Sequence, residues 1–307
     1  MAADDTNRSH GLNLPRNPLE DKTLPGTPPG QAQPWPGSDA ALRPQADHGE
    51  ESYRGGDKLP GLKALITGGD SGIGRAVAIA FAREGADVAF TYVEGKEEED
   101  AKETTRWIEK AGRKALAIGT DLRRQENCRA AVERTVRELG GLNILVNNAA
   151  FHIEAKDFRD IPAEQLENTF RTNVFSYVWM AQEAARRLKG GDVVINTGSV
   201  VALMPYPQLT DYSATKAAVL NLTRNMAVAL APEGVRVNCV APGPVWTPLI
   251  AATRDEEFVA EFGAKSLWHR PAQPAELAPS YVFLASTDSR YYTGEVLCPS
   301  GYPTTTR

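Results

Sequence analysis

The chain has 307 residues, of which 42% are apolar and 24% charged, and its formal net charge at pH 7 is −5. These values fit an ordinary globular protein with one large α/β domain, and they give no basic footprint for nucleic acid or an anionic membrane. The first residues lack the basic start and apolar core of a secretory signal, and the longest apolar runs are too short to span a bilayer, so we expect a cytoplasmic protein.

The N-terminal segment, residues 1–57, differs in composition from the rest of the chain. It carries eight prolines and shows neither helical nor strand periodicity, so it cannot build a core of its own. Trp35 and Tyr53 favour docking of this extended arm on the folded body or on a neighbouring subunit, with a disordered tail as the alternative. We therefore divide the chain into an arm, residues 1–57, and a folded domain, residues 58–307.

From Lys63 onward, short apolar runs alternate with segments of helical spacing. The apolar runs predict strands at residues 63–69, 87–93, 114–122, 142–149, 191–199, 235–243 and 294–301. The helical spacing predicts helices at residues 73–85, 96–112, 126–140, 166–187 and 212–230. This alternation is typical of a single-domain α/β protein with a Rossmann-type, doubly wound parallel sheet and helices on both faces, here extended by the N-terminal arm.

A glycine-rich turn, TGGDSGIG at residues 67–74, joins the first predicted strand to the first helix. In a doubly wound sheet this turn lies at the carboxyl edge, where ligands bind. Gly68 would permit the tight turn, Gly72 a close approach of backbone to ligand, and Gly74 close packing of the helix on the strand. The helix N-terminus would favour a pyrophosphate. A purely structural turn is the alternative, and no Gly-Lys-Ser/Thr follows as in a P-loop.

A second group of residues predicts proton transfer at the same edge. Tyr212 and Lys216 are four residues apart on a predicted helix, so they share one face, and Ser199 ends the strand predicted at 191–199. A phenol has an ordinary pKa of about 10, and a neighbouring ammonium favours the phenolate and lowers that pKa. The three side chains together therefore predict a site that binds a carbonyl or alcohol oxygen. An ordinary amphipathic helix with an exposed Tyr and Lys is the disfavoured alternative.

In this combination, residues 59–301 resemble the short-chain dehydrogenase/reductase family. The matching motifs are TGGDSGIG, TDL at 120–122, NNAA at 147–150, TNV with Asn173, Ser199, the Tyr212/Lys216 pair, and APGPVWTP at 241–248. The proline-rich leader is similar to that of a bacterial subgroup of the family. The resemblance implies an NAD(P)-dependent oxidoreductase that transfers a hydride between the nicotinamide and an aldehyde, ketone or secondary alcohol.

The same resemblance implies a role for each matching residue. Tyr212 would be the general acid/base, Lys216 would lower its pKa and hold the nicotinamide ribose, and Ser199 would bind the substrate oxygen. Asn173 would hold a water that links Lys216 to solvent. The other implied cofactor-binding residues are Gly68, Ser71, Gly72, Ile73 and Gly74 at the pyrophosphate, Asp121 and Leu122 at the adenine, Asn148 and Ala149 at the adenosine-side ribose, and Pro242, Gly243, Val245 and Thr247 at the nicotinamide.

The sequence indicates less clearly whether the cofactor carries a hydroxyl or a phosphate at its 2′ position. Ala150 stands where the family has Gly in NNAG. Its methyl group would narrow the space near the nicotinamide without abolishing cofactor binding. No Arg or Lys precedes Gly72 to pair with a 2′-phosphate; Glu94 would repel one, and Lys96 would attract one. We expect NAD, with NADP as the alternative. Because the three cysteines and four histidines are scattered along the chain, we expect no metal site.

The expected partner is a small carbonyl or alcohol substrate, with no nucleic acid and no membrane. Its pocket would draw on Phe151, His152 and the segments 200–210 and 246–269, whose aromatic residues are Tyr206, Trp246, Phe258, Phe262 and Trp268. Packing within a lid is the alternative for these aromatic residues, and His152 is a candidate substrate contact. The family also implies a homo-oligomer, a tetramer or a dimer, that packs through the helices predicted at 166–187 and 212–230.

Two other functions remain as alternatives, and two more are disfavoured. A 3-oxoacyl thioester reductase or a sugar dehydrogenase would share the fold and the motifs. Enoyl reduction is disfavoured, because that branch of the family spaces its Tyr and Lys by seven residues rather than four. A dinucleotide-binding regulator without turnover is also disfavoured, because all four catalytic positions are present.

Overall fold

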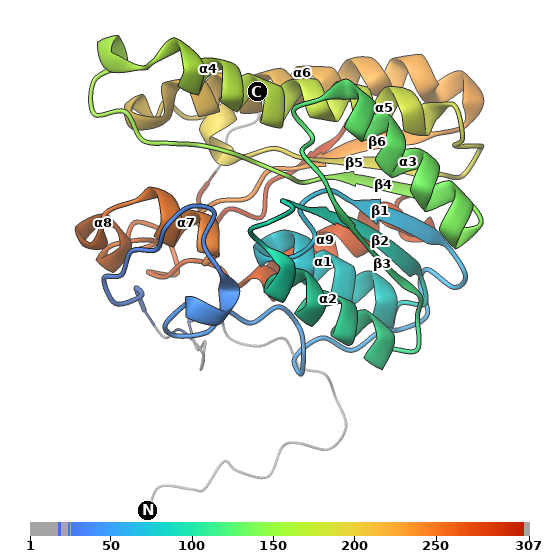
Figure 1. The fold of residues 1–307 in the computed structure, drawn as a ribbon, viewed down its shortest axis with the longest axis horizontal. Helices are drawn as coiled ribbons and strands as arrows, with labels where there is room; N and C mark the ends of the chain where they lie inside the picture. Colours follow the sequence, from blue (N-terminus) through green and yellow to red (C-terminus); the bar gives the residue numbers. More distant parts are fainter. Residues whose placement is uncertain (1–17, 20–23, 25, 304–307) are drawn as a thin grey trace, which may run out of the picture.

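A computed structural model describes residues 18–19, 24 and 26–303, and its centre is a seven-stranded parallel sheet (Figure 1). The strand order is β3-β2-β1-β4-β5-β6-β7. The strands are β1 Lys63–Ile66, β2 Asp87–Tyr92, β3 Ala115–Gly119, β4 Ile144–Asn147, β5 Val193–Thr197, β6 Arg236–Val240 and β7 Val296–Leu297. All seven lie within the segments predicted as strands, and the doubly wound α/β fold is confirmed.

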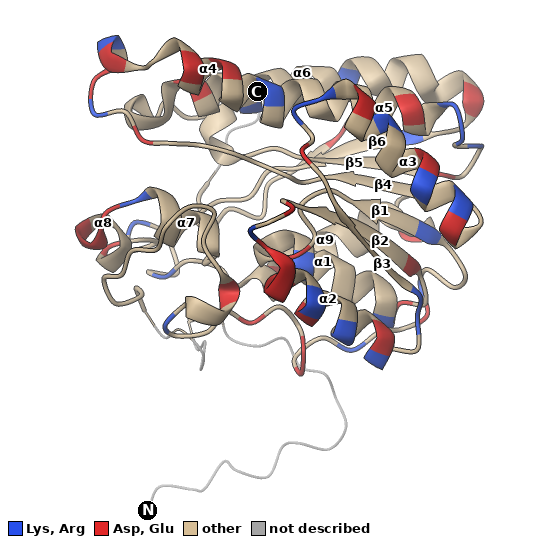
Figure 2. Ribbon diagram, viewed as in Figure 1, with Lys and Arg blue, Asp and Glu red and all other residues tan. Residues whose placement is uncertain are grey.

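Helices cover both faces of the sheet, with α1, α2 and α9 on one face and α3, α5 and α6 on the other (Figure 1). The helices are α1 Gly72–Arg83, α2 Glu98–Lys110, α3 Gln125–Leu139, α4 Ala163–Phe170, α5 Ser176–Ala185, α6 Thr210–Leu230, α7 Pro248–Thr253, α8 Glu256–Ala260 and α9 Pro274–Ala285. Figure 2 shows acidic and basic residues interspersed along the outer helices α2 and α3, while the central strands carry few charges. Among the described residues, no helix is long and apolar enough to cross a membrane.

The helices differ from the prediction in one interruption and in three helices, α7, α8 and α9, that were not predicted. The helix predicted at 166–187 is interrupted by a π-turn, Arg171–Phe175, which separates α4 from α5. Helix α9 was not predicted at all, because it holds Pro274 and Pro279 and its apolar residues do not follow a clear helical stripe. It packs on α1 and contributes the buried Tyr281 to the core.

The order of the strands places a ligand crevice at one edge of the sheet. The chain runs outward from β1 to β2 and β3, and then returns to the other side of β1 as β4. The loops after β1 and β4 therefore part in opposite directions, which opens a crevice at the carboxyl ends of these two strands.

The N-terminal arm docks on the body over its described residues 26–57 (Figure 1). Leu42 packs with Trp246 and Ala251 in a small apolar cluster, and the Trp246 indole N–H donates to the Pro44 carbonyl at 3.0 Å. The docking predicted from Trp35 and Tyr53 is thus confirmed for these residues, whereas the domain boundary at Lys58 stays a prediction. Residues 1–17, on which part of the expected arm falls, lie outside the described residues.

A buried aspartate fastens the arm to the start of α1. The Asp39 carboxylate accepts the Gly72 amide at 2.9 Å and pairs with His48 at 3.0 Å and Arg75 at 3.3 Å. These partners, together with the helix dipole, favour the carboxylate and hold the pKa of Asp39 at about 2 although burial opposes it. The pairing likewise raises the pKa of His48 to about 9 against the effect of burial.

The raised pKa of His48 makes the stability of this contact depend on pH. The folded-state pKa of about 9 exceeds the ordinary 6.5. The contribution of the His48–Asp39 ion pair to the free energy of unfolding is therefore complete below pH 6.5 and is lost as the pH rises through 9. We predict that wild type loses about 3 kcal/mol of unfolding free energy relative to His48→Gln between pH 6 and pH 9.5. Denaturant titrations at the two pH values measure this loss.

The exposed His269 provides the control. The difference between wild type and His269→Gln should not change over the same pH range. A difference between wild type and His48→Gln that is independent of pH would contradict the ion pair.

Candidate active site

A cavity of about 1400 Å³ opens at the carboxyl ends of the strands, where the crevice is expected. Most of the site residues predicted from the sequence line it: Gly68, Ser71, Gly72, Ile73, Asp121, Leu122, Asn148, Ala149, Ser199, Tyr212, Lys216, Pro242, Gly243, Val245 and Thr247. Gly74 and Asn173 do not line it and lie behind its wall. The fold therefore gathers residues from the ends of five strands and from α6 into one site.

The glycine-rich turn has the geometry that its sequence predicts. Gly68 and Gly72 have φ angles of +63° and +49°, in the left-handed region that favours glycine. A Cβ on Gly74 would lie 1.8 Å from the Gly68 carbonyl oxygen, so only glycine lets α1 start this close to β1. A Cβ on Gly72 would meet the Thr247 methyl at 2.9 Å, so the turn also packs against the far wall of the cavity.

One amide of this turn is already occupied by the protein. Gly72 donates to Asp39 of the arm, a contact that no sequence signal predicted, so this amide does not face a phosphate. The first backbone bond of α1 runs from the Arg75 amide to Ser71 at 3.0 Å. The Ile73 and Gly74 amides precede it and remain at the positive end of the helix dipole, where an anion is stabilised.

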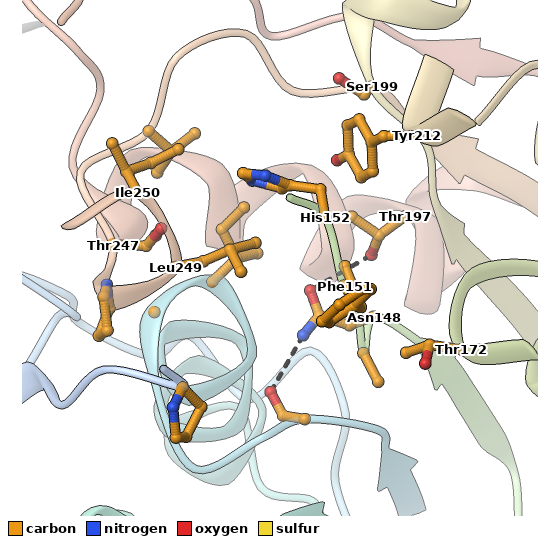
Figure 3. Close-up of a pocket in the computed structure, with 18 of the residues that line it drawn as sticks. Asn148, Phe151, His152, Thr172, Thr197, Ser199, Tyr212, Thr247, Leu249 and Ile250 are labelled. Carbon is orange, nitrogen blue, oxygen red and sulfur yellow. Dashed lines mark hydrogen bonds between the residues drawn. The ribbon is translucent and has the colours of Figure 1, made fainter. Parts of the chain in front are cut away.

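Asn148 holds the turn rather than offering its side chain to a ligand. Its amide group donates to the carbonyl oxygens of Thr67 and Gly68 at 3.1 and 3.0 Å, and its oxygen accepts from the Thr197 hydroxyl at 3.4 Å (Figure 3). The ribose contact implied for this residue is therefore not made by a free side-chain amide. Instead, Asn148 ties the ends of β1, β4 and β5 together.

The catalytic group predicted from the sequence comes together on α6 and at the end of β5. Figure 3 shows the Ser199 side chain directly beside the Tyr212 ring. Lys216 is fully buried, and its ammonium donates to the Thr197 carbonyl at 2.8 Å and to the Tyr177 hydroxyl at 3.4 Å. The ammonium lies 5.5 Å from the centre of the Tyr212 ring.

The protonation of this group differs from the expectation. Burial raises the pKa of Tyr212 to about 12, and the hydrogen bond with Ser199 only partly opposes that rise. Burial also lowers the pKa of Lys216 to about 8. The net pKa of Tyr212 therefore lies above the ordinary value of 10, because burial outweighs the other effects, and the lowering by Lys216 that the resemblance implies stays a prediction.

Asn173 lies in the π-turn between α4 and α5, a feature that often marks functional sites. Its side chain accepts from the Phe151 amide and donates to the Phe151 carbonyl, both at 2.8 Å, and also donates to the Thr215 hydroxyl at 3.1 Å. The role implied by the resemblance, holding a water, stays a prediction. They fix the segment after β4, which forms one wall of the cavity.

The N-terminal arm also supplies part of the cavity wall, which the sequence did not reveal. The Trp35 ring lies edge-on to Phe151 with 5.9 Å between ring centres, and the Lys96 ammonium lies 4.3 Å from the centre of the indole ring. Glu94 lines the same region. Asp121 also lines it and pairs with Arg123 at 2.8 Å.

The substrate end of the cavity agrees only in part with the prediction. Phe151, His152, Tyr206, Phe258 and Phe262 line it as expected. Trp246 and Trp268 do not: Trp246 is fully buried against the arm, and Trp268 is half exposed outside the cavity. Leu249 and Ile250 stand opposite His152 in Figure 3.

A nicotinamide dinucleotide fits these residues. The cavity is larger than an ordinary small-ligand pocket of 300–1000 Å³ and runs from the glycine-rich turn to Tyr212. Ser71 and Ile73 line it at the N-terminus of α1, where the helix dipole stabilises an anion such as a pyrophosphate.

Comparison with known proteins supports the same conclusion. A family model described as enoyl-(acyl carrier protein) reductase matches residues 68–301. General stress protein 39 of Bacillus subtilis is 50% identical over 266 residues, which cover 87% of this chain and 92% of that protein. Glucose and ribitol dehydrogenase of Daucus carota is 46% identical over 278 residues, covering 89% of this chain and 96% of that protein.

Solved structures give the same result. A short chain dehydrogenase from Burkholderia cenocepacia, in complex with NADP, superposes with a TM-score of 0.75 at 33% identity, over 80% of this chain and 98% of that chain. With a family model over most of the chain and relatives this similar, the chain belongs to the short-chain dehydrogenase/reductase family of NAD(P)-binding oxidoreductases.

Proposed function

We propose that this protein transfers a hydride between a nicotinamide dinucleotide and a small carbonyl or alcohol substrate, with Tyr212 as the general acid/base. The observation that carries the proposal is the meeting of Tyr212, Ser199 and Lys216 in one cavity with the glycine-rich turn. A phenol, a hydroxyl and a buried ammonium at this point suit an oxygen that gains or loses a proton.

The nicotinamide, when bound, supplies the hydride that reaches the carbonyl carbon. The Tyr212 and Ser199 hydroxyls bind the carbonyl oxygen and orient it. As negative charge develops on that oxygen, Tyr212 donates its proton to it, and alcohol oxidation reverses the transfer. With a pKa of about 12, Tyr212 is protonated at neutral pH and acts as an acid, which suits carbonyl reduction.

Lys216 supplies positive charge beside the proton donor. Its ammonium is held by the Thr197 carbonyl, which fixes it within the cavity wall near the Tyr212 ring. This charge stabilises the phenolate that Tyr212 becomes after donating its proton. We also propose that Lys216 binds the ribose next to the nicotinamide, as in the family.

For the cofactor's 2′ position, we propose that Lys96 binds a 2′-phosphate, so that NADPH is used for reduction. The lysine ammonium lies within the cavity over Trp35, and the superposed Burkholderia relative is in complex with NADP. Glu94, which lines the same region, opposes this and favours NAD. The expectation of NAD with NADP as the alternative is compatible with the comparisons and remains to be tested by binding.

Two other substrate classes, a sugar or polyol and a 3-oxoacyl thioester, remain as second candidates for an enzyme of this fold. The name of the carrot relative, glucose and ribitol dehydrogenase, favours a sugar or polyol, and polar Gln208 and Arg254 line the substrate end. The apolar Leu249, Ile250 and Phe258 on the opposite wall favour a small aldehyde or ketone over a phosphorylated substrate. A 3-oxoacyl thioester has no such specific support. The homo-oligomer expected through α4, α5 and α6 stays a prediction.

Removing the Tyr212 hydroxyl should stop turnover while preserving binding. We predict that Tyr212→Phe lowers kcat for propanal reduction by about 1000-fold, because the proton donor is lost. The dissociation constant for NADPH, measured by fluorescence titration, should stay close to that of wild type. Tyr206→Phe removes another phenol from the same cavity and should keep most of the activity. Full activity in Tyr212→Phe would overturn the mechanism.

The lowered pKa of Lys216 predicts the pH dependence of reduction. The ammonium is charged below about pH 8 and neutral above it, so kcat/KM for reduction should be flat near pH 7 and fall above about pH 8. Steady-state rates between pH 6 and 10 measure this. If kcat/KM stays constant up to pH 10, Lys216 does not act as proposed.

Lys96 should determine the affinity for the 2′-phosphate. We predict that Lys96→Ala raises the dissociation constant for NADPH about five-fold, because one charge-assisted hydrogen bond is lost, and that for NADH far less. Lys102→Ala removes an exposed lysine on α2 and serves as the control. Equal effects of Lys96→Ala on the two cofactors would assign the 2′-phosphate to another residue.

A further inference from the structure

His152 is a buried polar side chain without a hydrogen-bond partner at the active site. Its residue is 3% exposed and lines the cavity, and no described residue bonds either ring nitrogen; Nδ1 is fully shielded from solvent. Leaving a buried polar group unpaired is unfavourable, so most such groups in proteins have a partner. A ligand in the cavity is the remaining source of one.

The imidazole is held in a fixed place beside the proton donor. Asn173 binds the backbone of Phe151 on both sides, which anchors the preceding residue of the wall. The His152 ring packs edge-on against Tyr212 with 5.0 Å between ring centres. Figure 3 shows the ring turned toward Leu249 and Ile250, so a substrate between these residues and Tyr212 passes the imidazole.

The charge state of His152 restricts what it can bind. Burial lowers its pKa to about 3, and the positive charges of Arg254 and Lys216 act in the same direction. At neutral pH the ring is therefore uncharged, with one nitrogen that donates and one that accepts. A hydroxyl group, which also donates and accepts, is its natural complement.

Two other roles fit these observations less well. A proton relay to Tyr212 needs a hydrogen bond between the two side chains, whereas these rings meet only edge-on, and with a pKa of about 3 the imidazole takes up no second proton at neutral pH. An anion site needs a cation that is free to face the ligand, but Arg254 is paired with Glu154 at 2.6 Å and the Lys216 ammonium donates to Thr197 and Tyr177. A neutral hydroxyl satisfies the imidazole without moving a charge.

We propose that His152 hydrogen-bonds a hydroxyl on the carbon next to the reacting carbonyl, and so selects 2-hydroxy-aldehydes and the matching vicinal diols. This inference rests on the proposed function, because it takes the carbonyl oxygen to lie at Tyr212 and Ser199. It names the substrate class of that site: a short, uncharged hydroxy-carbonyl compound, whose carbon chain packs on Leu249 and Ile250.

The test compares two aldehydes that differ by a single hydroxyl, propanal and 2-hydroxypropanal, with NADPH in excess. The readout is the ratio of kcat/KM for 2-hydroxypropanal to kcat/KM for propanal. Because every variant sees the same substrate solutions, hydration of the aldehydes cancels when ratios are compared between variants. His152→Leu removes both polar nitrogens, and His152→Gln keeps one donor and one acceptor.

We expect His152→Leu to lower this ratio by about five- to ten-fold relative to wild type, the effect of one hydrogen bond. His152→Gln should restore most of it. Leu249→Val changes the volume of the same pocket without changing its hydrogen bonding, and should leave the ratio as in wild type. Circular dichroism and NADPH titration check that each variant is folded.

The outcomes separate this inference from the proposed function. If wild type reduces both aldehydes and His152→Leu has the wild-type ratio, the role of His152 is overturned while the proposed function stands. If His152→Gln behaves as His152→Leu, packing rather than hydrogen bonding sets the ratio, and the inference again fails. If wild type reduces neither aldehyde with NADPH or NADH, the proposed substrate class falls, and the role of His152 with it.

Discussion

The structure of the site depends on the burial of one ammonium group. Lys216 is completely shielded from water, so its charge has to be met by the protein, and the Thr197 carbonyl at the end of β5 meets it. That bond fixes α6 against the carboxyl end of β5 and so brings Tyr212 beside Ser199. The Thr197 side chain bonds Asn148 and Tyr281, which joins the same point to the glycine-rich turn and to α9. A single strand end thus positions both the proton donor and the cofactor turn.

The arm adds a second constraint at the other end of the cavity. Its Asp39 carboxylate lies at the start of α1, where the helix dipole favours an anion, and Arg75 and His48 balance its charge. The arm also packs on Trp246, in the segment that leads from the nicotinamide end to α7. One extended segment therefore contacts both the glycine-rich turn and the lid, and the two halves of the cavity share a support that lies outside the Rossmann-type sheet.

Local signals in the sequence predicted the features that short segments determine. The strands follow from apolar runs, the turn from its glycines, and the Tyr212/Lys216 pair from its spacing on a helix. Features set by distant contacts could not be predicted: α9 has no amphipathic stripe, Trp246 is buried by the arm rather than by the lid, and Asn148 is committed to Thr67 and Gly68. The net rise in the pKa of Tyr212 could not be predicted either, because spacing shows that a lysine is near but says nothing of burial or of where its ammonium donates.

Under the proposed function, the protonation states of the buried groups suit the proton transfer of carbonyl reduction. Tyr212, with a pKa raised to about 12, carries a proton at neutral pH, and Lys216, with a pKa of about 8, is still mostly charged. His152, with a pKa of about 3, is neutral and can bind a hydroxyl without adding charge. A site that holds a proton donor, a cation to stabilise the resulting phenolate and a neutral hydrogen-bonding neighbour is prepared for an uncharged carbonyl compound.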